Sequence, residues 1–373
     1  MKRIVFVMPN LREGGAEKVL VNLANHLDKS KFDVSIATLF AEGVNIQFLK
    51  PEVHYRGRFP KVFRGNKCLM KLFTPEQLYK TVVGEEYDVV IAYLEGPATR
   101  IVAGCPYTQS KLVAWVHGEQ HTMKQAADSF RSDKEALKCY KKYNKVVAVS
   151  NTVKEDFQSI FNLKDVPVEV LYNTNESEKI LAGAKESVDD GVFRQEEIKL
   201  ISVGRLKPEK GFDRLARVHL RLRQAGYMVH TYILGIGPQK NEIEKFIKEN
   251  ELSDSFTFLG YDTNPYKYVS KSDLFVCSSL REGFSTAATE ALIVGTPVCT
   301  VEVSGMKEML GENNEYGVIT ENNEDALYEG IKELLDSPDT LAYYKKKAEE
   351  RGRSFSTDVT VKAVEKMLEE LCE

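Results

Sequence analysis

Two carboxylates, Glu282 and Glu290, lie on either side of a short segment whose residue types suit a phosphate and a diol. The apolar run Leu274–Cys277 before them predicts a buried strand, and Ser285 and Thr286 predict the start of a helix. Free N–H groups at a helix start suit an anion, and a carboxylate can accept both hydroxyls of a ribose. The pattern therefore indicates a nucleotide-sugar site, although helix capping by acids explains it equally well.

Two cations, Arg205 and Lys210, follow a predicted strand near residue 203, in the segment ISVGRLKPEKGFDRL. Cations at the C-terminal edge of a strand stabilise the charge that develops on a departing diphosphate. The alternative is a solvated surface loop. The position after an apolar strand of an open sheet favours the functional interpretation.

The segment WVHGEQH places His117 at the end of another predicted strand, where it could hydrogen-bond a sugar hydroxyl. Glu119 and His121 follow in an order that differs from the zinc-binding helix motif, and no third ligand is apparent. The sequence also lacks an Asp-x-Asp pair after a strand. We therefore predict no metal, with Arg205, Lys210 and helix N-termini neutralising any diphosphate.

Gly14 and Gly15 stand at the first predicted strand-to-helix turn, in the segment PNLREGGAEK. Adjacent glycines let a phosphate or sugar approach the backbone closely. The same pair serves any tight strand-to-helix connection, and the GxGxxG dinucleotide pattern is absent here. On its own the pair favours the structural interpretation.

Residues 50–71 combine basic and aromatic side chains. Such a mixture suits the headgroup layer of an anionic membrane, and it equally suits a solvated loop. Glu52 is the one acid of the segment. The basic residues are Lys50, Arg56, Arg58, Lys61, Arg64, Lys67 and Lys71, and the interleaved apolar residues are Tyr55, Phe59, Phe63, Leu69 and Met70.

The composition is that of a globular protein of 373 residues, 43% hydrophobic and 28% charged, long enough for two domains. The first half is net basic and the second net acidic, but neither has the charge density of a nucleic-acid binder. The six cysteines form no CxxC pair, which indicates reduced thiols of a cytosolic protein. The first apolar run ends before Arg12 and Glu13, so no signal peptide is predicted, nor is any membrane span.

Apolar strand-like runs alternate with amphipathic helical stretches through both halves, which predicts an α/β protein with two doubly wound parallel sheets. A polar segment from Tyr172 to Gly191 separates the halves, with the hinge near Asn173. Residues 356–371 form a final amphipathic helix. The predicted strands are Arg3–Met8, Val34–Leu39, Asp88–Tyr93, Lys111–Val116, Val146–Val149, Val166–Leu171, Lys199–Val203, Val229–Leu234, Phe256–Leu259, Leu274–Cys277 and Pro297–Val301.

The motifs GRLKPEKGFDRL and REGFSTAATEALIVGTPV, in this order, resemble those of retaining glycosyltransferases of family 4 with the GT-B fold. The GG loop and WVHGE give weaker support, and the resemblance spans essentially the whole chain. It implies two Rossmann-like domains facing each other across a cleft, an acceptor-side domain at 1–173 and a nucleotide-sugar-binding domain at 174–355. It also implies that residues 356–373 form a helix crossing back to the first domain.

The resemblance also implies the roles of the site residues. Arg205 and Lys210 would bind the diphosphate, Glu282 the sugar hydroxyls and Glu290 the ribose. The catalytic set it implies is Arg205, Lys210, Glu282 and His117, and the donor-binding set is Gly14, Gly15, Gly204, Phe284, Ser285, Thr286 and Glu290.

The implied activity is metal-independent transfer of a sugar from a nucleotide diphosphate sugar, expected to be a UDP-sugar, to a saccharide or lipid-linked saccharide of a surface polysaccharide. No cofactor or nucleic acid is expected, and the expected location is the cytoplasm, at the inner face of the membrane if residues 50–71 bind lipid. Departures from the family pattern at 172–176 and at 303–305 affect hinge and acceptor contacts. The alternatives are a nucleotide-sugar epimerase of the same fold and a non-catalytic sugar-nucleotide-binding protein.

Overall fold

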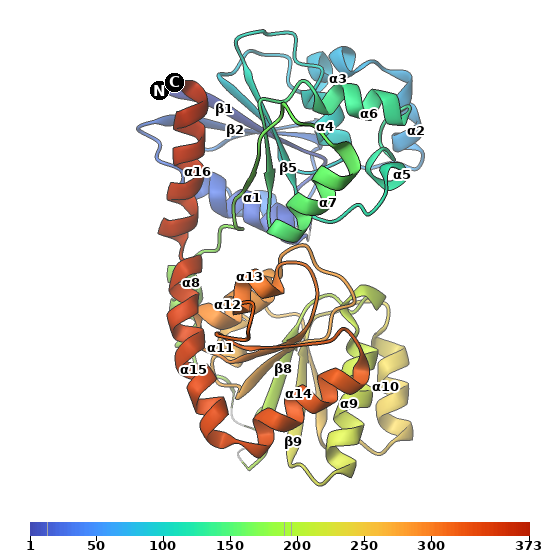
Figure 1. The fold of residues 1–373 in the computed structure, drawn as a ribbon, viewed down its shortest axis with the longest axis vertical. Helices are drawn as coiled ribbons and strands as arrows, with labels where there is room; N and C mark the ends of the chain where they lie inside the picture. Colours follow the sequence, from blue (N-terminus) through green and yellow to red (C-terminus); the bar gives the residue numbers. More distant parts are fainter. Residues whose placement is uncertain (13, 190, 195) are drawn as a thin grey trace. The chain divides into compact units, whose positions relative to one another are not determined.

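The computed structural model describes residues 1–12, 14–189, 191–194 and 196–373. The chain forms two compact units, which are described separately below (Figure 1). Unit 1 combines Met1–Asn175 with Thr357–Glu373, and unit 2 comprises Glu176–Ser356. Residue 190, within the polar segment predicted to separate the halves, and Glu13 of the first loop lie outside the described residues.

Unit 1 contains a parallel sheet of seven strands over its described residues, with helices between successive strands. In sheet order the strands are β3 (His54–Phe59), β2 (Phe32–Phe40), β1 (Lys2–Met8), β4 (Val89–Ala92), β5 (Lys111–Val116), β6 (Lys145–Ala148) and β7 (Val168–Val170). The helices are α1 (Gly15–His26), η1 (Val44–Phe48), α2 (Asn66–Leu72), α3 (Pro75–Val82), α4 (Pro97–Val102), α5 (Met123–Ala126), α6 (Asp133–Tyr140), α7 (Asn151–Phe161) and α16 (Thr357–Cys372).

Unit 2 contains a parallel sheet of six strands in the residues that the structure describes. In sheet order they are β10 (Phe256–Gly260), β9 (Val229–Leu234), β8 (Ile198–Val203), β11 (Leu274–Cys277), β12 (Val298–Val301) and β13 (Val318–Thr320). The helices are α8 (Ser177–Ala184), η2 (Pro208–Lys210), α9 (Phe212–Gln224), α10 (Lys240–Glu249), α11 (Tyr266–Val269), α12 (Thr286–Ile293), α13 (Met306–Leu310), α14 (Glu324–Asp336), α15 (Pro338–Gly352) and η3 (Arg353–Phe355).

These sheets confirm the predicted α/β class with two doubly wound parallel sheets. Their central strands are continuous apolar runs because both faces are covered by helices; every residue of β9 is buried, as are those of β1 from Ile4 to Met8. In each sheet the strand order reverses once, between β1 and β4 in unit 1 and between β8 and β11 in unit 2. Open α/β sheets bind ligands at the carboxyl ends of strands at such reversals.

Two strands were not predicted from the sequence, β3 and β13. β3 lies within the segment of residues 50–71 that was interpreted as a membrane contact or a loop. It is an edge strand in which no residue is buried, and it carries Arg56 and Arg58, so it lacks the apolar run that reveals a buried strand. β13 is also at an edge and has only three residues.

The C-terminal helix α16 is part of unit 1, where it packs beside α1 (Figure 1). Its Glu365 carboxylate accepts a hydrogen bond from the backbone N–H of Asp28 at 2.7 Å, and Glu369 pairs with Lys31 at 2.9 Å. Val364 and Leu368 are buried. The two ends of the chain therefore lie in the same unit.

Candidate functional site

Lys210 and Glu282 form an ion pair at the strand-order reversal of unit 2. Lys210 ends η2, in the connection after β8, and Glu282 lies in the loop after β11. Lys210 Nζ donates to Glu282 Oε1 at 2.6 Å, and Ser279 Oγ donates to the same oxygen at 2.6 Å. The structure thus brings together two residues that the sequence had suggested for separate parts of one ligand.

The backbone around this pair is tightly fixed. Gly211 has φ +62°, and a Cβ there would lie 2.2 Å from the carbonyl oxygen of Ser278, so glycine is required. Ser278 Oγ donates to the carbonyl of Lys210 at 3.0 Å. The buried guanidinium of Arg214 donates to the carbonyls of Ser278 and Ser279. These contacts tie the β8 and β11 loops together and set the position of the Lys210 ammonium group.

The charge of Lys210 is stabilised by its partner. Burial acts to lower the pKa of Lys210, but the charge of Glu282 and its hydrogen bond outweigh burial, and the net shift is upward. Lys210 is therefore a fixed cation at neutral pH. Water screens charge less in a partly buried position than in open solvent. The ammonium group therefore attracts an anionic ligand more strongly here than it would on an exposed surface.

The helix start predicted from the sequence is observed at α12. Ser285 is the N-cap, and its Oγ accepts from the backbone N–H of Ala288 at 3.4 Å. The first turn of a helix leaves N–H groups without an intrahelical acceptor, which suits an anion. Thr286 begins the helix, and the buried Phe284 ring packs on Phe355 with centroids 5.9 Å apart.

Glu290 lies about one turn inside α12, in a buried position with 8% of its surface exposed. Its Oε1 accepts a hydrogen bond from the Tyr266 hydroxyl at 3.2 Å. The carboxylate is therefore held by a neighbouring side chain. The assignment of Glu290 to the ribose stays a prediction, and it places the diol against a carboxylate that is largely buried.

Arg205 and Gly204 directly follow β8. The Arg205 side chain is exposed, and it makes no hydrogen bond or ion pair with any residue that the structure describes. Gly204 lies under the Lys210 side chain, since a Cβ there would be 3.6 Å from Lys210 Cδ and Cε. The structure brings Gly204 and Lys210 together, and Arg205 shares their loop without contacting Glu282.

In unit 1, His117 follows β5 and Glu95 follows β4. The His117 backbone N–H donates to Glu95 Oε2 at 2.9 Å. Burial lowers the pKa of His117 to about 4, so its ring is neutral at physiological pH, and it hydrogen-bonds the backbone of Tyr93. Among the described residues its Nε2 has no hydrogen-bond partner. Burial also raises the pKa of Glu95.

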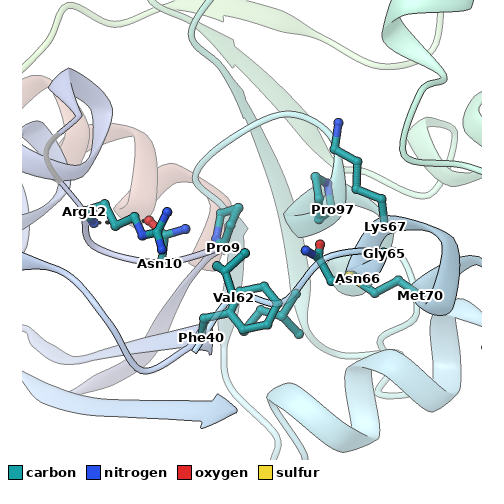
Figure 2. Close-up of a pocket in the computed structure, with 11 residues that line it drawn as sticks. Pro9, Asn10, Arg12, Phe40, Val62, Gly65, Asn66, Lys67, Met70 and Pro97 are labelled. Atoms are coloured by element: carbon teal, nitrogen blue, oxygen red, sulfur yellow. Dashed lines mark hydrogen bonds between the residues drawn. The ribbon is translucent and has the colours of Figure 1, made fainter. Parts of the chain in front are cut away.

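A groove of about 500 Å³ lies at the strand-order reversal of unit 1, beyond the ends of β1, β2 and β4. Figure 2 shows Arg12 and Lys67 at its two ends, with Phe40 and Val62 between them. Arg12 pairs with Glu42 at 2.7 Å and Lys67 with Asp128 at 2.9 Å. The groove therefore offers apolar walls with cations at its ends.

Gly14 and Gly15 form the start of α1, close in sequence to Arg12. Gly14 is the N-cap residue with extended backbone, and Gly15 is the first helical residue. A Cβ at Gly14 would meet the Glu17 carboxylate at 1.7 Å, but that group is the flexible end of a side chain and can move aside. Gly14 and Gly15 thus occupy the strand-to-helix turn predicted from the sequence.

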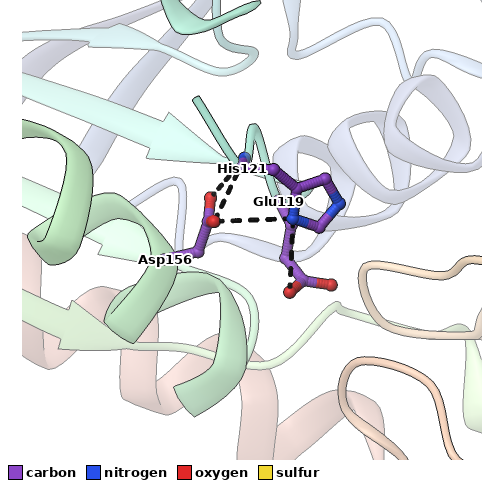
Figure 3. A group of neighbouring side chains, drawn as sticks. All are labelled: Glu119, His121 and Asp156. Carbon is purple, nitrogen blue, oxygen red and sulfur yellow. Dashed lines mark hydrogen bonds and ion pairs between the residues drawn. The ribbon is translucent and has the colours of Figure 1, made fainter. Parts of the chain in front are cut away.

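In the structure, a third potential metal ligand lies beside Glu119 and His121, which was not apparent from the sequence. Asp156 of α7 lies 3.7 Å from His121, measured from Oδ1 to Nδ1, and Glu119 lies 4.0 Å from the same nitrogen (Figure 3). These donor atoms lie within 4.8 Å of one another. His117 is not part of this group.

Sequence reasoning missed Ser279, Arg214 and Glu95. Arg214 contacts the carbonyls of Ser278 and Ser279, 64 and 65 positions away, which no local pattern reveals, whereas Ser279 contacts Glu282 within its own loop. Glu95 follows the short buried strand β4, and that position after an apolar run was a signal that could have drawn attention to it.

Comparison with known proteins decides the family. Residues 13–175 match the family described as Glycosyltransferase Family 4, and residues 184–351 match the family described as Glycosyl transferases group 1. The chain belongs to the family 4 glycosyltransferases. This glycosyltransferase is 27% identical over 370 residues to the N-acetylgalactosamine-N,N'-diacetylbacillosaminyl-diphospho-undecaprenol 4-alpha-N-acetylgalactosaminyltransferase of Campylobacter jejuni, covering 95% of this chain and 96% of that protein.

Solved structures establish the GT-B fold of this glycosyltransferase. A glycosyltransferase from Rickettsia africae superposes with a TM-score of 0.80 at 18% identity, covering 100% of this chain and 99% of that chain. Anabaena HepE, crystallised with UDP and glucose, gives a TM-score of 0.75 at 18% identity, covering 99% of this chain and 100% of that one. At these identities the likeness concerns the fold.

Proposed function

We propose that this glycosyltransferase transfers a sugar, with retention of anomeric configuration, from a UDP-sugar to a saccharide or lipid-linked saccharide of a surface glycan. The observation that carries the proposal is the Lys210–Glu282 pair at the strand-order reversal of unit 2. Two related findings support it. HepE was crystallised with UDP and glucose, and the C. jejuni relative acts on a saccharide carried by diphospho-undecaprenol.

In the proposed site, Lys210 neutralises the diphosphate that leaves. The ammonium group is already oriented by Glu282 and the backbone around Gly211, so little reorganisation is needed when charge develops on the leaving group. Arg205, whose guanidinium makes no ion pair with the described residues, is the second proposed cation. With two cations and the start of α12 available, the donor chemistry needs no metal at the diphosphate.

The carboxylates are proposed to act as hydroxyl acceptors. Glu282 Oε1 is occupied by Lys210 and Ser279, and the carboxylate has further lone pairs for sugar hydroxyls. Glu290, held by Tyr266, is assigned to the ribose. Phe284, Ser285 and Thr286 are assigned to phosphate and sugar contacts at the start of α12.

His117 is proposed to contact a hydroxyl of the transferred sugar. Its ring is neutral, and the bond to the Tyr93 backbone leaves Nε2 as an acceptor. Gly204, Gly14 and Gly15 stay proposed donor contacts, where small residues permit close approach.

The proposed reaction follows a front-face course. The bond between the sugar C1 and the diphosphate oxygen breaks, a bond from the acceptor oxygen to C1 forms on the same face, and the acceptor proton passes to the departing diphosphate oxygen. Such a course needs no carboxylate nucleophile. Catalysis then depends on positioning and on stabilising the leaving group.

Residues 50–71 of unit 1 are the proposed contact with an anionic membrane, and the adjoining exposed Leu72 and Phe73 extend it. This contact would place the enzyme at the inner face of the cytoplasmic membrane. The exposed apolar side chains here are those of Phe59, Phe63, Leu69, Leu72 and Phe73, with Leu72 exposed by 73%, and basic side chains alternate with them. The end of α2 is held rigidly, because Arg100 donates to the carbonyls of Met70 and Phe73 and Arg131 to that of Leu72. None of the described helices is long and apolar enough to cross a bilayer.

The proposal is tested by incubating the purified enzyme with UDP-sugars and saccharide acceptors and analysing the products by mass spectrometry and NMR. Transfer with retained anomeric configuration supports it. Epimerisation of the donor without an acceptor would instead establish the epimerase alternative. Binding of UDP-sugars with no turnover on any acceptor tried, including polyprenyl diphosphate saccharides, would favour a non-catalytic binding protein.

A further inference from the structure

Three potential metal ligands from two separate segments meet beyond the end of β5 (Figure 3). Glu119 and His121 come from the loop after β5, and Asp156 comes from α7. We propose that these three side chains form a binding site for a divalent transition-metal cation such as Zn²⁺. The site lies in unit 1 and is independent of the donor chemistry proposed for Lys210.

The donor atoms are of the right type and nearly at the right separation. A cation with bonds of about 2.0–2.2 Å in tetrahedral geometry needs ligand atoms roughly 3.3–3.6 Å apart. His121 Nδ1 lies 3.7 Å from Asp156 Oδ1 and 4.0 Å from Glu119 Oε1. Shifts of less than an ångström in side chains that are partly exposed would bring all three into coordination.

Hydrogen bonds already hold the backbone that carries these ligands in place, so metal binding would not have to order it. The Asp156 carboxylate accepts from the backbone N–H of Gln120 at 2.7 Å and of His121 at 3.1 Å. His121 has φ +56°, a left-handed conformation that is uncommon for a residue with a side chain. Bonds of this kind orient a ligating carboxylate, and its remaining lone pairs stay available.

The donor set favours a borderline cation. One imidazole nitrogen and two carboxylate oxygens suit Zn²⁺, whereas Mg²⁺ and Ca²⁺ prefer oxygen ligands alone. Two carboxylates beside a neutral imidazole leave a net negative charge that a divalent cation would compensate. Water would complete the coordination, because three protein ligands leave at least one position open.

The competing explanation is an ion pair in which protonated His121 bridges the two acids. His54 provides the comparison. Its Nε2 lies 3.2 Å from Asp33 Oδ1, so His54 pairs with one carboxylate where His121 lies beside two. A simple His–acid pair of that kind should bind no metal. Replacing each histidine in turn therefore separates a metal site from an ion pair.

The test uses the full chain carrying Cys68→Ser, which removes the exposed thiol as a competing ligand. After EDTA treatment and its removal, Co²⁺ is titrated at pH 7.5 and d–d absorption in the visible region is recorded. We expect saturation at one Co²⁺ per chain and displacement by Zn²⁺. Glu119→Gln and His121→Gln should each weaken binding at least tenfold, and His54→Gln should leave it unchanged.

Circular dichroism of each metal-free variant verifies that it is folded. The inference is overturned if the parent chain shows no d–d band, or if folded His121→Gln binds as tightly as the parent. An independent readout is the thermal midpoint, which Zn²⁺ should raise in the parent and in His54→Gln but not in His121→Gln. Sugar transfer is not used as the readout. A negative result for metal binding therefore leaves the proposed function unchanged, and a negative result for sugar transfer leaves the metal site unchanged.

Discussion

The two units share one architecture but differ at the edges where their strands end. In unit 2 the reversal between β8 and β11 presents a compact, partly buried arrangement, with Lys210, Glu282 and Ser279 joined by hydrogen bonds of 2.6 Å. In unit 1 the reversal between β1 and β4 presents an open groove whose charged residues are already paired at its ends. The unit 2 edge therefore holds its charges in fixed positions, whereas the unit 1 edge presents an open surface.

The difference is one of preorganisation. The unit 2 edge fixes charge where a diphosphate would leave, which is the main requirement for catalysis by electrostatic stabilisation. The unit 1 edge supplies apolar surface, exposed cations and a neutral histidine, and we propose that the acceptor binds there. If this comparison is right, substitutions in unit 2 should mainly lower kcat, and substitutions on the open surface of unit 1 should mainly affect acceptor or membrane binding.

Lys210→Ala should have the largest effect. Removing a preorganised charge from a leaving group costs about 10²–10³ in kcat, and we expect a loss of that size with the fold intact. Lys207→Ala is the matched control, because Lys207 lies in the same loop and pairs only weakly with Glu209 at 3.9 Å. Steady-state kinetics and a thermal melt of both variants make the test, and near-wild-type kcat for Lys210→Ala would contradict the role assigned to unit 2.

His117→Asn should have the next largest effect, a loss of roughly tenfold to a hundredfold if the ring contacts the sugar. The pKa of about 4 predicts that activity shows no step from His117 titration between pH 5.5 and 9. The depressed pKa also means that the unfolded chain binds a proton at higher pH than the native chain does. The contribution of His117 to stability is therefore complete above about pH 6.5 and falls as the pH drops toward 4.

The pH dependence of this position can be checked by chemical denaturation at several pH values. The difference in unfolding free energy between wild type and His117→Asn should shrink or reverse as the pH falls from 6.5 to 4, provided both remain folded. A constant difference over that range would show that His117 titrates normally.

Ser279→Ala should have a smaller effect, about threefold to tenfold on kcat. The hydroxyl holds Glu282 Oε1, and Lys210 still binds the same oxygen when the hydroxyl is absent. Ser278→Ala serves as the comparison, since Ser278 Oγ contacts the backbone of Lys210 and not Glu282. If Ser279→Ala were as damaging as Lys210→Ala, positioning of Glu282 would outweigh the lysine charge.

The smallest effect on turnover with a soluble acceptor is expected for the double variant Leu72→Ser and Phe73→Ser. Both side chains are exposed, so the fold should be unaffected, but sedimentation with vesicles of phosphatidylglycerol should fall at least threefold. Leu181→Ser, an exposed apolar residue of unit 2, is the matched control. Absence of binding by wild type at low ionic strength would rule out the proposed membrane contact.

Much of the fold was predictable because buried parallel strands are apolar runs. Leu274–Cys277 and Lys111–Val116 match their predicted limits, as does the helix start at Ser285. The edge strand β3 was missed because none of its residues is buried, so residues 54–59 lack the apolar run of a buried strand.

Individual residues of the candidate site could be predicted from the sequence, but the contacts between them could not. Lys210 and Glu282 each stood out after a strand, whereas their direct pairing depends on two loops 72 positions apart. Asp156 lies 35 positions from His121, on another element, and so could not be identified as its partner. Burial of Glu290 likewise follows from packing against Tyr266, which local pattern does not reveal.

The central claim is that the Lys210 charge binds the donor diphosphate, and calorimetric titration of UDP tests it most directly. Wild type, Lys210→Ala and Lys207→Ala are compared under one buffer condition. We predict that Lys210→Ala weakens UDP binding at least tenfold while Lys207→Ala and uridine binding change little. Equal UDP affinity in wild type and in folded Lys210→Ala would contradict the claim.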